Sequence, residues 1–255
     1  MQEITTAQRK LIASLDKARN RRREGLFAAE GTKCVLDTID AFGLRHLVAT
    51  SAWWQEHPEL ASRPQAVLAR PADMERITAL STPPPVLAVY DLPPEPQVPG
   101  IAPGELVVAL DCVQDPGNLG TIVRAADWMG VHTILASRDT VDIFGSKAVQ
   151  ATMGAISRVT VHYCDLAARL EKLDAAVPVF GTFLGGENIY TTDNLGPGGV
   201  LVMGNEGRGV SPAVAALCTR RLTIPSWPPG SPTSESLNVG VATAIALAAF
   251  RSRLF

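Results

Sequence analysis

The stretch ELVVALDCVQDPGNLGTIVRAADWMGVHTILA, residues 105–136, contains the pattern that decides the fold of this chain. Short apolar runs at Leu106–Leu110 and Thr133–Ala136 are typical of buried parallel strands. A helix-like segment, Leu119–Met129, lies between them. A strand, a helix and a second strand in this order predict two parallel strands with the helix packed on one face of the sheet.

The same alternation continues towards the end of the chain. Apolar runs predict further strands at 177–182, 200–203 and 221–224, and helical patterns at 165–173, 212–217 and 236–250. We therefore expect an α/β domain whose mostly parallel sheet is covered on both faces. Ligands of such sheets bind beyond the carboxyl ends of the strands, so the loops there form the candidate site.

A proline-rich segment precedes this domain. In Leu92–Gly104, LPPEPQVPGIAPG, five of thirteen residues are proline, which is incompatible with a helix or a central strand. We interpret residues 92–104 as a linker between an N-terminal domain, 1–91, and a C-terminal domain, 105–255. The first domain alternates short helical and strand patterns and is predicted to be a small α/β sandwich.

Composition excludes several classes of protein. The chain has 255 residues, 46% of them hydrophobic, and a net charge of −2, which is a globular balance and not that of a polycation. Its four cysteines form no C-x-x-C pair, and its four histidines share no metal-ligand spacing, so we expect reduced thiols and no metal. No apolar run is long enough to span a bilayer as a helix. These features predict a cytoplasmic protein.

Three loops that follow predicted strands carry polar or glycine-rich sequence. The first is DCVQDPGNLGTIVR (111–124), with Asn118 and Arg124; the second is MGNEGRGVSP (203–212), with Glu206 among three glycines; the third is IPSWPPGSPTSESLN (224–238). Each has an ordinary structural interpretation. Asn118 is suited to cap the following helix, Arg124 to be a surface charge, and the glycines to form a tight turn. The sequence lacks the G-x-G-x-x-G, P-loop and G-x-S-x-G motifs.

The three loops together closely resemble the SpoU/TrmH family of the SPOUT superfamily, the RNA 2′-O-ribose methyltransferases. Asn118, Gly120 and Arg124 match the first signature of that family. Gly204, Glu206 and Gly209 match the second, and Ile224-Pro225 with Ser236-Leu237-Asn238 match the third. The run RRREGLFAAEG (21–31) is similar to the L30e-like substrate-binding domain that precedes many such catalytic domains.

The resemblance implies an activity and a set of site residues. The expected reaction is methylation of a ribose 2′-hydroxyl in structured RNA by S-adenosylmethionine, with ribosomal RNA favoured over tRNA. The implied catalytic residues are Asn118, Arg124, Glu206, Ser236 and Asn238. We interpret Arg124 as a clamp on the phosphate next to the ribose, because a guanidinium stays protonated and is a poor base. Glu206 would orient Arg124 or Asn118, and Ser236 would cap the last helix or contact RNA.

The resemblance also implies a cofactor pocket, a homodimer and a trefoil knot near the C-terminus. The residues expected to hold the cofactor are Thr182, Gly204, Ile224 and Leu237. RNA contacts are expected from the basic cluster Arg19, Arg21, Arg22 and Arg23, which has an alternative interpretation as a solvated helix end.

Two departures from the family pattern and two rival functions accompany this interpretation. The loop 226–235 is longer than usual, and Gly240 replaces a common serine, a change expected to alter helix packing. One rival is a catalytically silent RNA-binding or ribosome-assembly protein of the same fold. The other is a nucleotide-binding α/β enzyme, which the missing phosphate-loop motifs disfavour.

Overall fold

The computed structural model describes residues 1–193, 195–229 and 231–254 of the chain. They form two compact units. The first comprises Met1–Pro94 together with Asp142–Ser157, and the second comprises Glu95–Val141 together with residues from Arg158 onwards. The chain therefore passes between the units at three points, not only through the proline-rich segment. The domain boundaries that the sequence suggests stay a prediction.

The second unit is built on a six-stranded sheet whose strands are all paired in parallel. Its order is β11-β9-β10-β6-β7-β8. The strands are β6 (Leu106–Leu110), β7 (Thr133–Ser137), β8 (Thr160–Cys164), β9 (Val179–Asn188), β10 (Gly199–Met203) and β11 (Arg220–Thr223). The predicted parallel sheet is confirmed. Strand β8, with its His162 and Tyr163, was not predicted because its polar residues interrupt the apolar run.

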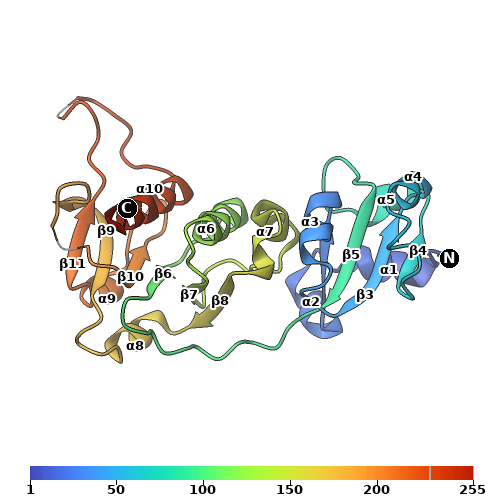
Figure 1. Ribbon diagram of the computed structural model, residues 1–255, viewed down its shortest axis with the longest axis horizontal. Coiled ribbons are helices and arrows are strands. Elements are labelled where there is room, and N and C mark those ends of the chain that lie inside the picture. The colour runs from blue at the N-terminus through green and yellow to red at the C-terminus, as the bar shows by residue number, and fades with distance from the viewer. Residues whose placement is uncertain (194, 230, 255) are drawn as a thin grey trace. The chain divides into compact units, whose positions relative to one another are not determined.

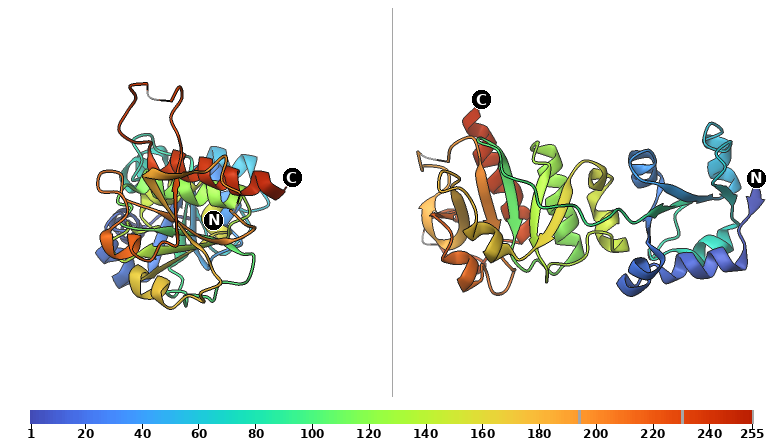
Figure 2. Two further views of the ribbon diagram at one scale, coloured as in Figure 1. Left: turned by 90° about the vertical axis from the view of Figure 1, so that its left-hand side faces the viewer. Right: turned by 90° about the horizontal axis from the view of Figure 1, so that it is seen from below.

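Helices cover both faces of this sheet (Figure 1, Figure 2). They are α6 (Pro116–Trp128) and α10 (Val239–Arg251) on one face, and α8 (Leu166–Glu171) and α9 (Pro212–Ala215) on the other, with a 3₁₀ turn at Ser252–Leu254. Alternate residues of each strand point to opposite faces. Val107 and Val200 therefore pack with Val214 of α9, and Phe180 of β9 meets Phe250 of α10 at 5.0 Å between ring centroids.

The first unit contains a mixed five-stranded sheet of order β1-β4-β3-β5-β2. Its strands are β1 (Gln2–Glu3), β2 (Leu26–Glu30), β3 (Leu44–Ala49), β4 (Ala66–Leu68) and β5 (Val86–Asp91); its helices are α1 (Thr6–Ser14), α2 (Ala18–Glu24), α3 (Thr32–Thr38), α4 (Ser51–Glu56) and α5 (Pro71–Ile77). Helices α1 and α5 bury Ile12 and Met74 against Val48, Val67 and Leu87 of the sheet. The predicted α/β sandwich is confirmed.

Residues Asp142–Ser157 pack within the first unit although they lie between β7 and β8 of the second unit in sequence. They form α7 (Ser146–Thr152) and a 3₁₀ turn, Ala155–Ser157. The Phe144 ring packs against the Phe27 ring at an angle of 58°, with centroids 4.8 Å apart, and a Cβ at Gly154 would lie 2.4 Å from the Cβ of Asp37. The sequence patterns predicted no element for residues 142–157. Burial of their apolar side chains, such as Phe144, explains why this segment packs within the first unit.

One ion-pair cluster fixes the start of α5. The carboxylate of Asp73 accepts hydrogen bonds from the Arg9 guanidinium, from Arg70 Nε at 3.0 Å and from the Arg70 backbone N–H at 3.3 Å. The side chain of Asp73 is only 4% exposed. Its hydrogen bond with the Arg70 side chain is the main reason why the pKa of Asp73 falls to about 2. The cluster therefore stabilises the folded state through the ionised carboxylate.

We expect Asp73→Asn to lower the free energy of unfolding by about 1–3 kcal/mol at pH 7, because buried charge-assisted hydrogen bonds are lost. The stabilisation is fully present above the unfolded pKa of about 3.9. It is lost as the pH falls through the folded value of about 2. Urea unfolding at several pH values measures the difference, with Glu75→Gln as an exposed control on the same helix. A difference that does not change with pH would contradict this account.

Candidate functional site

The candidate site lies at the switch point of the parallel sheet. Strands β6 and β10 are neighbours, but the chain continues from β6 to β7 on one side, whereas β9 and β11 lie on the other. Loops that leave adjacent strands in opposite directions open a crevice at the carboxyl edge of the sheet. The loops here are residues 111–115 after β6 and residues 204–211 after β10.

The loop after β10 is closed tightly on itself. Asn205 and Gly209 exchange two backbone hydrogen bonds of 3.0 and 2.9 Å, and Gly209 has φ of +68°. A Cβ on Gly204 would lie 2.3 Å from the backbone of Gly209 and Val210, so the position accepts only glycine without movement of the loop. Glycine at position 204 is therefore required for the close approach of the two backbone segments.

The Asn205 side chain joins the two loops. Its Oδ1 accepts hydrogen bonds from the backbone N–H groups of Gly207 at 2.9 Å and Arg208 at 3.1 Å, and its Nδ2 donates to the Cys112 carbonyl at 2.8 Å. A second link runs from the Ser211 N–H to the buried Asp111 carboxylate at 2.6 Å. These two side chains fix the crevice, because each satisfies backbone groups on the opposite loop.

Cys112 occupies a strained position between these links. Its φ of +62° lies in the left-handed region, which is uncommon for a residue other than glycine. Its N–H donates to Ser137 Oγ at 2.8 Å. The hydrogen bond between the thiol and Asp139 is the main cause that raises the pKa of Cys112. The thiol is therefore held in its protonated form and is not an activated nucleophile.

A chain of side-chain hydrogen bonds crosses the crevice. Asn118 Nδ2 donates to Glu206 Oε1 at 2.6 Å, and Asn238 Nδ2 donates to Asn118 Oδ1 at 2.8 Å. One residue from each of the three sequence motifs takes part. The sequence offered Arg124 or Asn118 as the residue that Glu206 orients, and the structure shows Glu206 in contact with Asn118.

The capping roles predicted for Asn118 and Ser236 are wrong. Asp115 is the N-cap of α6 and its carboxylate accepts from the Asn118 N–H at 2.8 Å, while Pro116 takes the first helical position. Asn118 lies inside the first turn, which leaves its side chain free for Glu206. The N-cap of α10 is Asn238, whose Oδ1 accepts from Gly240 at 2.9 Å and Val241 at 3.2 Å, and Ser236 lies exposed before it.

Close packing of α10 on α6 brings Asn238 to Asn118. A Cβ on Gly240 would lie 3.0 Å from Thr121 Cγ2. At the other end of the pair, the Arg251 guanidinium donates to the carbonyls of Met129 at 2.7 Å and Gly130 at 3.1 Å. The expectation that Gly240 affects helix packing agrees with this contact.

Arg124 lies on the exposed side of α6, six residues beyond Asn118. Within the part of the chain that the structure describes, its guanidinium makes no hydrogen bond or ion pair. All of its donors are therefore available to a ligand.

Of the residues predicted to hold a cofactor, three lie at or near the carboxyl ends of neighbouring strands, and Leu237 lies just before α10. Thr182 in β9 donates its hydroxyl to the Val202 carbonyl at 3.0 Å, and Gly204 follows β10 directly. Ile224 follows β11 and is half-buried, whereas Leu237 is 45% exposed. The pairing of β9 with β11 is interrupted after Gly181–Arg221 and resumes at Glu187–Leu222, so residues 182–186 bulge out of the sheet. All four residues are uncharged, and Thr182, Gly204 and Ile224 share one edge of the sheet.

One of the predicted RNA contacts has a different role in the structure. Arg21 is 4% exposed, and its guanidinium donates to the carbonyls of Leu15 and Asp16, each at 2.9 Å, and to Asp142 at 2.5 Å. Its two Nη atoms serve the interior of the first unit and its side chain is buried, so the structure contradicts a phosphate contact for this residue. Arg19, Arg22 and Arg23 are exposed.

Sequence reasoning missed Asp111, Asp115 and Asn205. Asp115-Pro116 is a helix-start signal that the more prominent Pro116-Gly117-Asn118 turn obscured. Asn205 stands beside Gly204, and an asparagine in a glycine-rich loop is a known former of Asx turns. Among the described residues, no group of three His, Cys, Asp or Glu side chains is placed to hold a metal, and no helix is long and apolar enough to cross a bilayer.

Comparison with known proteins shows the family of the chain. The SpoU rRNA Methylase family model matches residues 105–248, and an MRM3-like substrate binding domain matches residues 7–88. The AdoMet-bound rRNA methyltransferase from Sinorhizobium meliloti is 30% identical with a TM-score of 0.84, over 100% of this chain and 98% of that one. The fold is therefore that of the SPOUT methyltransferases. The chain belongs to the SpoU rRNA methylase family.

Two further relatives extend over nearly the whole chain. The 23S rRNA (guanosine(2553)-2′-O)-methyltransferase RlmP of Bacillus subtilis is 28% identical over 249 residues, 96% of this chain and 97% of the relative. A structure from Porphyromonas gingivalis, described as a proposed RNA methyltransferase of the TrmH family, is 38% identical with a TM-score of 0.83, over 98% of this chain and 99% of that one.

We expect Asn205→Ala to loosen the crevice loop while the unit stays folded. The N–H groups of Gly207 and Arg208 would lose their acceptor, and the Cys112 carbonyl its donor, at a cost of about 1–3 kcal/mol. Amide hydrogen exchange should then accelerate at residues 207–209 and remain unchanged in β6 and β10. Glu206→Gln is the control, because it leaves the Asn205 contacts in place. Unchanged protection of the loop amides in Asn205→Ala would refute this role.

Proposed function

We propose that this protein transfers a methyl group from S-adenosylmethionine to a ribose 2′-hydroxyl in ribosomal RNA. The observation that carries the proposal is the hydrogen-bonded set Glu206–Asn118–Asn238 at the switch point of the sheet, with the unpaired Arg124 on the same helix. The relatives named above as rRNA methyltransferases support the substrate class. A tRNA substrate is the second possibility within this class. Action on ribosomal RNA implies a cytoplasmic enzyme.

The residues at the strand ends fit S-adenosylmethionine. The cofactor carries an adenine ring with apolar faces and a positively charged sulfonium group. When bound, it supplies the methyl group, whose carbon is the electrophile. Leu237 and Ile224 offer apolar surface, Thr182 contributes a small polar side chain, and the glycine at 204 brings backbone close to the edge of the sheet. No Lys or Arg is among these residues, so nothing in this set repels a cation. We assign Thr182, Gly204, Ile224 and Leu237 to its binding.

The role of the crevice residues is to bind and orient the ribose. Asn118 uses one N–H for Glu206 and its oxygen for Asn238, so its second N–H remains for a ligand. Asn238 donates one side-chain N–H to Asn118 and uses its oxygen to cap α10, so its second N–H also remains for a ligand. Side chains fixed in this way position a nucleophile with little loss of entropy on binding, and positioning alone contributes about 7–11 kcal/mol to such reactions.

Arg124 is proposed to bind the phosphate beside the reactive ribose. A guanidinium stays protonated at neutral pH and makes paired hydrogen bonds to phosphate oxygens. Its positive charge also favours the deprotonated form of a nearby hydroxyl, which makes that oxygen a better nucleophile. Ser236 remains a candidate for an RNA contact, since it is exposed beside Asn238.

We further propose a homodimer and the trefoil knot that the family resemblance implies. The dimer is supported by apolar surface on α6 and α10, where Trp128 is 87% exposed and Val241 is 48% exposed. These two exposed side chains, at opposite ends of the helix pair, are apolar surface that a partner subunit would cover. Its position on the helices that carry Asn118 and Asn238 would join the interface to the site.

We expect Arg124→Ala to lower the rate of RNA methylation by at least about 100-fold, as the loss of a single charge-stabilising group does in other enzymes. The affinity for S-adenosylmethionine should stay within a few-fold, because Arg124 acts on the RNA. Single-turnover methylation and calorimetry measure the two quantities. Lys172→Ala, an exposed residue after α8, is the control. Wild-type activity in Arg124→Ala would remove this residue from the mechanism.

The rival function, a silent RNA-binding protein, makes a separate prediction. It requires no cofactor, so neither S-adenosylmethionine nor its demethylated product should bind at millimolar concentration. The proposed enzyme should bind both, and total RNA from cells with and without the gene should differ in 2′-O-methylation at a defined nucleotide.

The basic cluster provides a matched test of RNA binding. Replacing the exposed Arg22 and Arg23 by alanine should weaken RNA binding. The slope of log K against log salt concentration should fall by about 1–2 units, because fewer counterions are released when fewer phosphates are contacted. Arg21→Ala should instead lower the free energy of unfolding by about 2–4 kcal/mol, because it leaves Asp142 and two carbonyls without their donor. Equal salt slopes for the wild type and Arg22→Ala/Arg23→Ala would show that the cluster is only a solvated helix end.

A further inference from the structure

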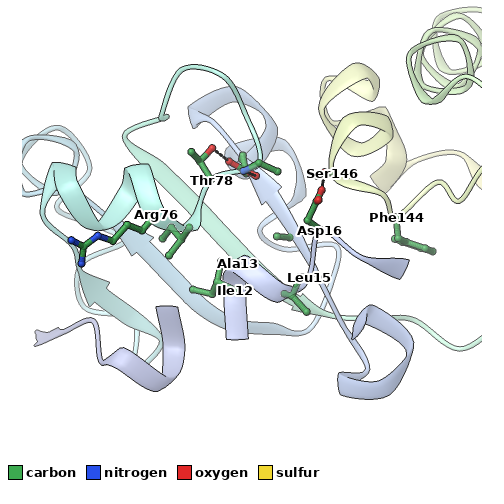
Figure 3. Close-up of a pocket in the computed structure, with 12 residues that line it drawn as sticks. Ile12, Ala13, Leu15, Asp16, Arg76, Thr78, Phe144 and Ser146 are labelled. Atoms are coloured by element: carbon green, nitrogen blue, oxygen red, sulfur yellow. Dashed lines mark hydrogen bonds between the residues drawn. The ribbon is translucent and has the colours of Figure 1, made fainter. Parts of the chain in front are cut away.

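A cavity of about 210 Å³ lies within the first unit (Figure 3). Residues of α1, β2 and the end of α5 line it, together with Phe144 and Ser146 of the 142–157 segment. Pockets for drug-sized ligands have about 300–1,000 Å³. The cavity therefore suits one ring system and not a complete cofactor.

A buried carboxylate forms part of its wall. Glu30 is 4% exposed and accepts hydrogen bonds from the Thr78 hydroxyl and from the Ala79 N–H at 3.0 Å. No Lys, Arg or His pairs with it among the described residues, and Arg76, which also lines the cavity, points its guanidinium away from it (Figure 3). Burial is the main cause that raises the pKa of Glu30. An unpaired buried carboxylate is costly unless further donors reach it.

Asp16 provides a second acceptor in the same cavity. Its Oδ1 accepts from Ser146 Oγ at 3.0 Å, and its negative charge contributes to the raised pKa of Glu30. Apolar side chains, including Ile12 and Ile77, form other parts of the wall. The lining therefore combines acceptors with surface that suits the faces of a ring.

We propose that this cavity binds a guanine base extruded from the RNA substrate, a role that rests on the proposed function in RNA modification. RNA-binding proteins commonly recognise unstacked bases by burying the ring and bonding its Watson–Crick edge. Guanine presents two adjacent donors there, N1–H and N2–H₂, which match carboxylate oxygens. Uracil presents one donor between two acceptors and would place carbonyl oxygens against Glu30.

Two other ligands fit the cavity less well. A metal ion would need more ligands than Glu30 and Asp16, and no third metal-binding side chain joins them in the described chain. A cationic peptide side chain would satisfy Glu30 but would leave much of the apolar wall around Ile12 and Ile77 uncovered. A base has donors along its edge and two apolar faces, so it can satisfy both parts of the lining.

The test measures binding of GMP, IMP and UMP to the full-length protein by NMR titration. GMP should bind, IMP, which lacks the N2 amino group, should bind about tenfold more weakly, and UMP should bind more weakly still. Glu30→Gln should raise the dissociation constant for GMP by at least about tenfold, and the exposed Glu75→Gln should not. Ala13→Phe, which fills the cavity without touching the Glu30 hydrogen bonds, should also raise the dissociation constant for GMP. This variant replaces Glu30→Gln in the test if Glu30→Gln fails to fold.

Three results would overturn the proposal: equal binding of GMP and UMP, unchanged GMP binding in both cavity variants, or binding of argininamide in place of GMP. Methylation of ribosomal RNA by the wild type is measured in parallel. If the RNA is methylated and GMP does not bind, only the cavity proposal fails. If GMP binds and no RNA is methylated, the proposed reaction fails and the base site stands.

Discussion

The parallel pairing of β6 with β10 is the constraint on which the site depends. It places two loops at one edge of the sheet, and a few side chains then hold them together. Asn205 reaches the Cys112 carbonyl, and Asp111 accepts from the Ser211 N–H. Because both links satisfy backbone groups, the loops keep their form without packing a large apolar core between them.

The three asparagine and glutamate side chains of the crevice depend on that frame. Glu206 is carried by one loop, Asn118 by the first turn of α6, and Asn238 by the start of α10. Each helix begins with a capping carboxylate or amide, Asp115 for α6 and Asn238 for α10. Asn238 thus both starts α10 and joins the site, whereas Asp115 starts α6 and accepts from the Asn118 N–H.

Much of the fold and of the site could be predicted from sequence, and the failures have physical reasons. Strands such as Leu106–Leu110 are continuous apolar runs, and the motif residues Asn118, Glu206 and Asn238 do meet. Sequence could not show that Arg21 is buried, because its partner Asp142 lies 121 positions away. It also missed α7 and β8, whose short or mixed patterns gain their stability from tertiary contacts.

The path of residues 142–157 has a consequence for dissecting the molecule. Phe144 covers Phe27, and Cys34 lies against the Val149 carbonyl, so a fragment that ends at the proline-rich segment would lose part of its own interior. The first unit therefore cannot be isolated or transferred to another protein as one continuous segment of the chain. A version of this unit that keeps its interior must also contain residues 142–157, either as a separate polypeptide or joined to it by circular permutation.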